Sequence, residues 1–256
     1  MNVHFACTRC GACCRHDKLP LNVAEAVVWL QAGHRVQILC DAIPWPGEPP
    51  PEDLPAAHRA RRSTIAMSGS MPTRITVILA ADIGSACPNL GPDDRCSAYD
   101  RRPIVCRVYP FEINPFIRLE QARKKCPTEA WSPTGPLIQR QGRTFDPAVR
   151  ADIERSRAID ERDVPVKARL CAALGISHAA LANEGFAVHS PDPQTLLREL
   201  IRASVPDGAV PDNGWNVVSN RRETVLAVNE IGGAGAHVAD MPSPCFQYLG
   251  FLPTSA

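Results

Sequence analysis

Four cysteines at the start of the chain carry its strongest chemical signal. They are Cys7, Cys10, Cys13 and Cys14, in the pattern C-x-x-C-x-x-C-C. A C-x-x-C turn places two sulfurs on the same side of a tight loop, where both can reach one metal ion or iron–sulfur cluster. The pattern therefore predicts that thiolates at this end of the chain bind a metal centre.

A second set of cysteines follows in the same half of the chain: Cys87, Cys96, Cys106 and Cys126. The first three cysteines of the opening run have the spacing of a bacterial ferredoxin, whose fourth ligand comes from a distant segment. Here Cys87, Cys106 or Cys126 could supply it. Eight thiols could fill two four-cysteine zinc sites or ligate one cubane with thiols left over, and the sequence does not choose between these.

The two adjacent cysteines, Cys13 and Cys14, are expected to differ in role. Neighbouring side chains point in different directions, so the two thiols do not meet one metal in the same way. We expect one of them to serve a second centre or to stay free for redox work.

The residues around Cys106 and Cys126 suggest how such a site is supported. Three arginines flank Cys106: Arg101, Arg102 and Arg107. Guanidinium groups favour the thiolate form of cysteine, so we expect them to hold the thiols deprotonated. We also expect Tyr99 and Tyr109 to pack beside the centre.

The composition indicates a cytoplasmic globular protein. The net charge of +1, from 28 basic and 27 acidic residues, gives no electrostatic footprint for nucleic acid or anionic lipid, so we expect neither as a partner. The N-terminal sequence lacks the layout of a secretory signal, and no apolar stretch reaches the roughly 18 residues that span a bilayer. Cytoplasmic thiols stay reduced, so dense cysteines there indicate metal binding before disulfides, and the odd total of 11 agrees with this.

The first half is expected to be irregular apart from a few elements. Asn22 is a candidate cap for a helix over residues 23–30. Residues 74–80, rich in β-branched side chains, predict a strand that delivers the chain to Cys87. Residues 111–119 predict a second strand, placed at a sheet edge by Pro115.

The second half is expected to be mainly helical. The pattern predicts helices over residues 147–163, 166–174, 177–183 and 193–203, and short strands over 215–218 and 224–228. The fold class that follows is α+β, with an irregular, metal-organised, cysteine-rich N-terminal half and a mainly helical C-terminal half. We divide the chain into a cysteine-cluster metal-binding domain over 1–130 and a C-terminal region over 131–256.

Two segments of the chain resemble a known family, CTRCGACC and CPNLGPDDRCSAYDRRPIVCRVYPF. It is similar to the CxxCxxCC family of zinc- or iron-chelating domains, the YkgJ-type cysteine-cluster proteins, from Cys7 to about Cys126. The resemblance implies a metal set of Cys7, Cys10, Cys13, Cys14, Cys87, Cys96 and Cys106, and Cys126 matches a later family cysteine. The family includes relatives of a flagellin lysine N-methylase whose cysteine motif is associated with an iron–sulfur cluster. This chain is shorter than those methylases.

We therefore expect a cysteine-cluster metal-binding protein that holds an iron–sulfur cluster, with 4Fe-4S preferred, or zinc. Its role would be structural, metal handling or redox. The alternative is an enzyme similar to the iron–sulfur-dependent protein lysine N-methylases, with a protein substrate. A second alternative is a metal- or redox-sensing regulator, because residues 166–183 have the rhythm of a helix-turn-helix. The expected second helix lacks the Arg, Lys or Gln side chains that read base edges, which favours an ordinary helical hairpin.

The remaining metal-ligating residue types are expected to lie outside the centre. Cys40 and Cys171 stand in apolar contexts that indicate core positions. His4 and His16 flank the opening run and are expected to be surface imidazoles. No catalytic residue is assigned.

Overall fold

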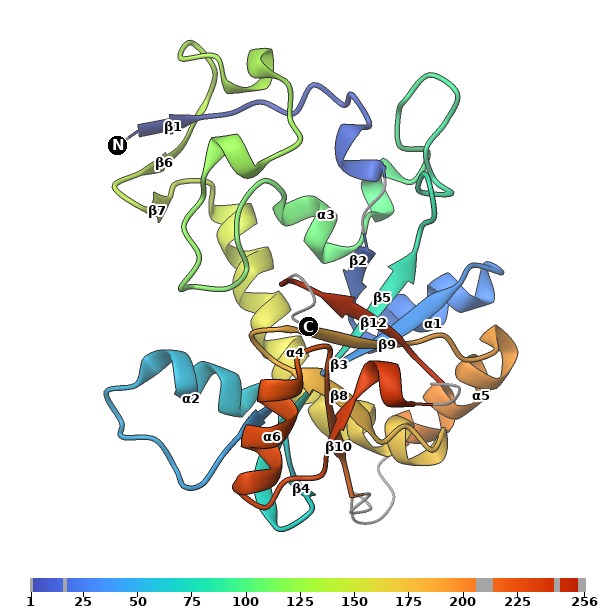
Figure 1. The fold of residues 1–256 in the computed structure, drawn as a ribbon. Coiled ribbons are helices and arrows are strands. Elements are labelled where there is room, and N and C mark those ends of the chain that lie inside the picture. Colours follow the sequence, from blue (N-terminus) through green and yellow to red (C-terminus); the bar gives the residue numbers. More distant parts are fainter. Residues whose placement is uncertain (1, 16–17, 206–213, 242–244, 253–256) are drawn as a thin grey trace. The chain divides into compact units, whose positions relative to one another are not determined.

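The computed structural model describes residues 2–15, 18–205, 214–241 and 245–252, and its chain falls into two compact units (Figure 1). Unit 1 comprises Met1–Leu21 and Ala81–Ile159. Unit 2 comprises Asn22–Ala80 and Asp160–Ala256. His16 lies outside the described residues. All eight clustered cysteines belong to unit 1.

Unit 1 is built from short elements joined by long loops. Its strands β1 (Asn2–His4), β6 (Leu137–Arg140) and β7 (Arg143–Thr144) form a three-stranded antiparallel sheet in the order β1-β6-β7. The other elements are β2 (Lys18–Leu21), α3 (Ile104–Val108), the first part of α4 (Pro147–Ala173) and the 3₁₀ turns η1 (Ala12–Cys14), η2 (Tyr99–Arg101), η3 (Gln121–Arg123) and η4 (Thr128–Trp131).

The core of unit 1 is small and aromatic in part. Phe5 and Trp131 pack with their ring centroids 4.8 Å apart. Ile104 and Val108 of α3 join them, together with Phe111 and apolar residues of β6 and α4. Cys126 packs against this cluster, so one of the eight cysteines is anchored directly to the core.

Unit 2 is organised around a mixed sheet. Its strands are β3 (Val36–Pro44), β4 (Thr64–Ser68), β5 (Met71–Asp82), β8 (His178–Leu181), β9 (Gly185–His189), β10 (Asn216–Ser219), β11 (Gly235–His237) and β12 (Gln247–Gly250). They run in the order β11-β10-β8-β3-β5, with β4 on β5, β9 on β3 and β12 on β9. Its helices and 3₁₀ turn are α1 (Val23–Gln31), α2 (Leu54–Arg61), the second part of α4, α5 (Pro193–Ser204), α6 (Arg222–Glu230) and η5 (Val238–Asp240).

Four neighbouring strands of this sheet, β11, β10, β8 and β3, are parallel. Parallel neighbours need a crossover between them, and α6 provides it between β10 and β11 (Figure 1). Ala179 and Ala180 of β8 and Val217 and Val218 of β10 are almost completely buried. The middle of the sheet is therefore the core of unit 2.

The structure is mixed α and β, but the expected mainly helical C-terminal half is wrong. Residues 177–183, predicted as a helix, contain strand β8, and residues 224–228, predicted as a strand, lie in helix α6. A helix-turn-helix over 166–183 is therefore not formed, and neither is a helical hairpin. Pairing on both sides by β3 and β10 overrides the local preference of an alanine-rich segment.

Two further elements differ from expectation. Residues 147–163 and 166–174 were predicted as separate helices, but α4 runs continuously through Pro165. Residues 111–119 form turns and bends rather than an edge strand. Here Phe111, Ile113 and Leu119 pack onto the unit 1 core, and Asn114 and Pro115 favour turns over pairing.

Other expectations are confirmed. Asn22 caps α1 in a capping box with Glu25, the predicted strand over 74–80 lies within β5, and the predicted helix over 193–203 is α5, which Asp192 caps. The strand expected at 215–218 is β10, displaced by one residue.

Candidate metal centre

The opening cysteine run is held in place by a glycine. Gly11 has φ +68°, a left-handed conformation that suits glycine, and η1 follows it directly. A β-carbon on Gly11 would lie 2.7 Å from the carbonyl oxygen of Asp94 and 2.8 Å from Cδ1 of Leu90. The run can therefore lie against the loop that carries Cys87 and Cys96 because position 11 has no side chain.

Backbone hydrogen bonds tie that loop to the end of the run. The amide of Cys87 donates to the carbonyl of Cys14 at 2.8 Å. The amide of Leu90 donates to the carbonyl of Cys87 at 2.9 Å, and Leu90 forms a β-bridge with Cys96. Cys14, Cys87 and Cys96 therefore lie around the neck of one closed loop.

Cys106 projects from the short helix α3, whose residues Ile104 and Val108 are buried in the unit 1 core. Burial raises the pKa of the Cys106 thiol to about 12. Nearby thiolates add to the rise, while Arg102 opposes it. These thiolates belong to Cys14, Cys87 and Cys96. Cys106 therefore shares its electrostatic environment with the three cysteines at the loop neck.

Cys126 lies near the other end of the opening run. The amide of Ala6, next to Cys7, donates to the carbonyl of Ala130 at 2.8 Å, which joins the segment before Cys7 to the turn after Cys126. Burial raises the pKa of Cys126, a hydrogen bond from Tyr109 lowers it, and the thiolates of Cys10 and Cys7 raise it. Lys124 lowers it in turn, and this lysine also pairs with Glu112 at 2.5 Å.

The adjacent cysteines, Cys13 and Cys14, differ in their surroundings. The thiol of Cys14 bonds to the sulfur of Cys13, so the pKa of Cys13 is lowered and that of Cys14 is raised. Cys13 also interacts with the thiolates of Cys106, Cys126 and Cys7. It is therefore the residue that touches both the loop neck and the surroundings of Cys126.

The flanking arginines do not by themselves hold the free thiols deprotonated. Burial, or for Cys14 the bond to Cys13, outweighs the cations and raises four thiol pKa values, those of Cys14, Cys87, Cys106 and Cys126. Arg102 does lie beside the thiols, but Arg107 forms a two-pronged pair with Asp152 at 2.8 and 3.0 Å. A bound cation would have to supply the charge that deprotonates these thiols.

The sequence reasoning missed three cations near the thiols. Arg15 lowers the pKa of Cys14, and Lys124 lowers that of Cys126. Arg9 lies 4.1 Å above the ring of Tyr99, which Arg102 contacts at 3.5 Å. Each missed residue stands within two positions of a cysteine in the chain, a signal that could have found it.

The donor set has the chemistry of a metal centre, but its thiols do not yet surround one point. Soft thiolates select zinc, copper(I) or iron–sulfur clusters. Across the described part of the chain, no group of three or more His, Cys, Asp or Glu side chains stands in a metal-holding arrangement. Ligation therefore requires the thiols to turn inward, and the exposed Cys7, Cys10 and Cys13 have room to do so.

The other candidate ligands lie apart from the eight. Cys40 and Cys171 are buried in unit 2, as predicted, and Cys245 is exposed there. His4 is partly buried, and its Nδ1 bonds to the carbonyl of Gly135 at 2.8 Å.

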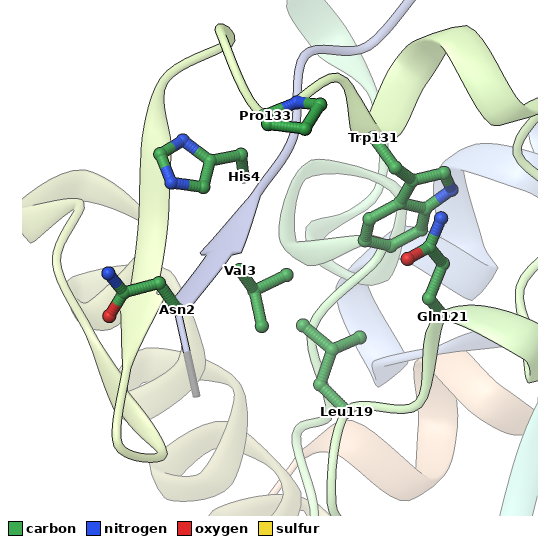
Figure 2. Close-up of a pocket in the computed structure, with 7 residues that line it drawn as sticks. All are labelled: Asn2, Val3, His4, Leu119, Gln121, Trp131 and Pro133. Carbon is green, nitrogen blue, oxygen red and sulfur yellow. The ribbon is translucent and has the colours of Figure 1, made fainter.

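Two hollows lie next to the turn that carries Cys126. One, of about 160 Å³, is lined by β1 and by Leu119, Gln121 and Trp131 (Figure 2). Figure 2 shows Val3 and Leu119 pointing toward each other into it, with Trp131 and Gln121 along one side. The second is an open depression of about 460 Å³ that shares Gln121 and Trp131 and includes Cys126 in its wall.

Residues 6–127 match the family model CxxCxxCC, which is described as a "putative zinc- or iron-chelating domain". This segment belongs to that family. All eight clustered cysteines lie within the matched residues, so the CxxCxxCC domain contains the whole thiol set. The matched range also includes residues 22–80, which belong to unit 2.

The other comparisons add nothing to this assignment. No curated protein and no solved structure matches the chain. Within the described ranges, no helix is both long and apolar enough to span a bilayer.

Proposed function

We propose that this protein binds a metal through the eight cysteines of its CxxCxxCC domain and holds an iron–sulfur cluster, with zinc as the other candidate. The observation that carries the proposal is that eight thiols from four separate chain segments lie in one unit and act on one another electrostatically. The ligands proposed are Cys7, Cys10, Cys13, Cys14, Cys87, Cys96, Cys106 and Cys126.

The spacing of the opening cysteines supports the iron–sulfur assignment. A zinc ion and a 4Fe-4S cluster each use four thiolates, so the number of thiols fits two centres of either kind. Cys7, Cys10 and Cys13 have the spacing of ferredoxin ligands, and Cys126 comes from a distant segment. A bound cluster would supply redox chemistry, whereas zinc would act as a structural staple or as cargo.

The surroundings of the thiols also support metal binding over a thiol-rich loop with no ligand. Unit 1 has a small core and short elements, and such structure is usually stabilised by a metal or by disulfides. Its cysteines are free thiols. Structural zinc contributes roughly 10 to 16 kcal/mol to the folding of small domains, enough to hold this unit together.

The test is anaerobic purification of the full chain, followed by analysis of iron, zinc and acid-labile sulfide. Iron and sulfide in equal amounts, with a brown colour, support the cluster. Zinc without sulfide supports the zinc form and removes the redox roles. A protein that takes up neither metal after reconstitution with iron and sulfide, or with Zn²⁺, refutes the proposal.

The open depression favours a second candidate function. Its wall places Lys124, Thr128 and Trp131 beside the thiol of Cys126, so a substrate held there would meet a centre ligated by Cys126. An enzyme similar to the lysine N-methylases would use such a space. Binding of adenosylmethionine by the metal-loaded protein, measured by calorimetry, tests this candidate, and no binding counts against it.

A further inference from the structure

We infer that the eight cysteines form two separate four-thiolate centres. The first, called the neck centre, consists of Cys14, Cys87, Cys96 and Cys106. The second, called the outer centre, consists of Cys7, Cys10, Cys13 and Cys126. This inference rests on the proposed function, because it concerns how the bound metal is divided.

The backbone ties the two ends of the opening run to different partners. At the front end, the amide of Ala6 bonds to the carbonyl of Ala130, near Cys126. At the back end, the carbonyl of Cys14 accepts the amide of Cys87. The C-x-x-C-x-x-C-C run therefore extends from the turn after Cys126 to the loop that begins at Cys87. Its first and last cysteines lie near different members of the second set.

The neck centre has a preformed frame. The Leu90–Cys96 bridge and a 2.8 Å hydrogen bond from Ser97 to Asn89 close the loop and bring its two cysteines to one end. Gly11 packs on the same loop without a side chain. The helix α3 then supplies Cys106 from the core side.

The outer centre is anchored on one side only. Cys126 packs on the unit 1 core, and the hydroxyl of Tyr109 bonds to its sulfur while accepting the amide of Lys125 at 2.9 Å. Its other three members are exposed to solvent on the opening run. This centre is therefore open, whereas the members of the neck centre are all half-buried.

Apart from those of Cys13, the electrostatic interactions follow the same division. Cys106 interacts with all three other neck thiolates, and Cys87 with Cys14 and Cys96. In the outer set, Cys126 interacts with Cys10 and Cys7, whereas Cys13 interacts with Cys14 and Cys106 of the neck more strongly than with Cys126 and Cys7. Charge interactions weaken with distance, so these groupings report which thiols are near one another.

Cys13 belongs to the outer centre although it also touches Cys14 and Cys106. Its spacing from Cys10 repeats that of Cys10 from Cys7, and the neck already has four thiols without it. The bond between Cys13 and Cys14 makes these two residues the point where the centres adjoin.

The different exposure of the two centres predicts different lability. Both centres would have four thiolate ligands, but a chelator reaches the exposed thiols of the outer centre more readily than the half-buried thiols of the neck centre. The outer centre also borders the open depression beside Cys126. We assign the neck centre to stability and the outer centre to exchange or reaction.

The experiment uses the full chain, loaded with Zn²⁺ under anaerobic conditions and passed through gel filtration. Metal content is measured for the wild type, for Cys106→Ser and Cys96→Ser in the neck, and for Cys126→Ser and Cys10→Ser in the outer centre. Cys245→Ser, exposed and outside both sets, is the matched control. Circular dichroism identifies any variant that fails to fold. In that case the metal content of the other variant of the same centre is used to test the inference.

We expect about two zinc ions in the wild type and in the control, and about one in each single variant, because each ion takes four thiolates. A chelator should remove the ion of the outer centre first, so Cys126→Ser and Cys10→Ser leave the slowly released ion and the neck variants leave the fast one. One ion in the wild type that is lost in every cysteine variant from both sets overturns the two-centre inference but leaves the proposed function standing. No zinc in the wild type overturns the inference of two zinc-binding centres, and the proposed function is refuted as well only if reconstitution with iron and sulfide also fails.

Discussion

Replacing Gly11 by alanine tests whether the opening run must lie against the loop of Cys87 and Cys96. Gly11 has φ +68°, and its new β-carbon would meet the carbonyl oxygen of Asp94 at 2.7 Å. Gly84 is the matched control, since it lies in the same unit with φ +55° and has nothing within 4 Å of its β-carbon position. Both changes carry the cost of a left-handed alanine, about 1 to 2 kcal/mol, but only Gly11→Ala adds a backbone clash.

The size of the clash sets the expected effect on metal binding. Restoring ordinary contact with Asp94 requires a shift on the order of 1 Å. Metal–ligand distances vary by only roughly 0.2 Å, so a shift of this size moves the sulfurs of Cys10, Cys13 and Cys14 out of bonding distance of the metal unless the run rearranges. We expect a loss of about 10- to 100-fold in zinc affinity, comparable to the loss of a supporting contact around a metal.

The assay is competition for Zn²⁺ against a chromophoric chelator, with thermal unfolding of the metal-free proteins measured in parallel. Gly84→Ala should lower thermal stability with little change in zinc affinity, whereas Gly11→Ala should lower both. Equal zinc affinities of the two variants would refute the argument that close packing of the run on the loop positions its thiols.

Three further predictions concern other parts of the chain. Burial alone would raise the pKa of Asp160, but Lys167 and Arg62 outweigh burial and hold this pKa below its usual value. The pairing therefore stabilises the fold above about pH 4, and this contribution is lost as the pH falls through the lowered pKa. Asp160→Ala should therefore lower the free energy of unfolding by about 2 to 3 kcal/mol at pH 7, measured with urea, and an equal loss at pH 3 would contradict this. Glu184→Ala should cost about 1 to 3 kcal/mol in the same measurement, because the buried hydroxyl of Ser219 donates to Glu184 at 2.5 Å, and a loss below about 0.5 kcal/mol would show that the bond contributes little. The raised pKa of Cys106 means that its proton must leave when metal binds, so zinc affinity should rise with pH between 6 and 8 with release of protons, and a pH-independent affinity would contradict ligation by these thiols.

The elements that sequence predicts well here have strong local signals. The helix α1 is specified by Asn22 and Glu25, which bond reciprocally to each other's backbone at 2.9 and 3.0 Å. Strand β5 is a run rich in β-branched residues, which are enriched in strands.

The elements that sequence predicts wrongly are set by distant partners. Residues 224–228 contain Thr224, Val225 and Val228, which favour a strand locally, but β10 and β11 are parallel and need a helix between them. Pro165 predicts a helix end, yet α4 continues because residues on both sides are fixed in unit 2. Asp163 accepts the amide of Val23 at 2.8 Å, and Lys167 is buried.

The thiol set was predicted from the sequence in part. Residue type and spacing identify eight candidate ligands, and the structure gathers them in one unit. Which cysteines are neighbours depends on backbone bonds between segments far apart in the chain, such as Ala6 with Ala130 and Cys14 with Cys87. No one-dimensional pattern contains those pairings.

X-ray absorption spectroscopy of the metal-loaded protein tests the central claim most directly. The account predicts a first shell of about four sulfur atoms around each metal, at about 2.3 Å for zinc, with no nitrogen or oxygen ligand. A first shell made mainly of nitrogen or oxygen, or a sulfur shell that persists when Cys106 and Cys126 are both replaced by serine, would contradict it.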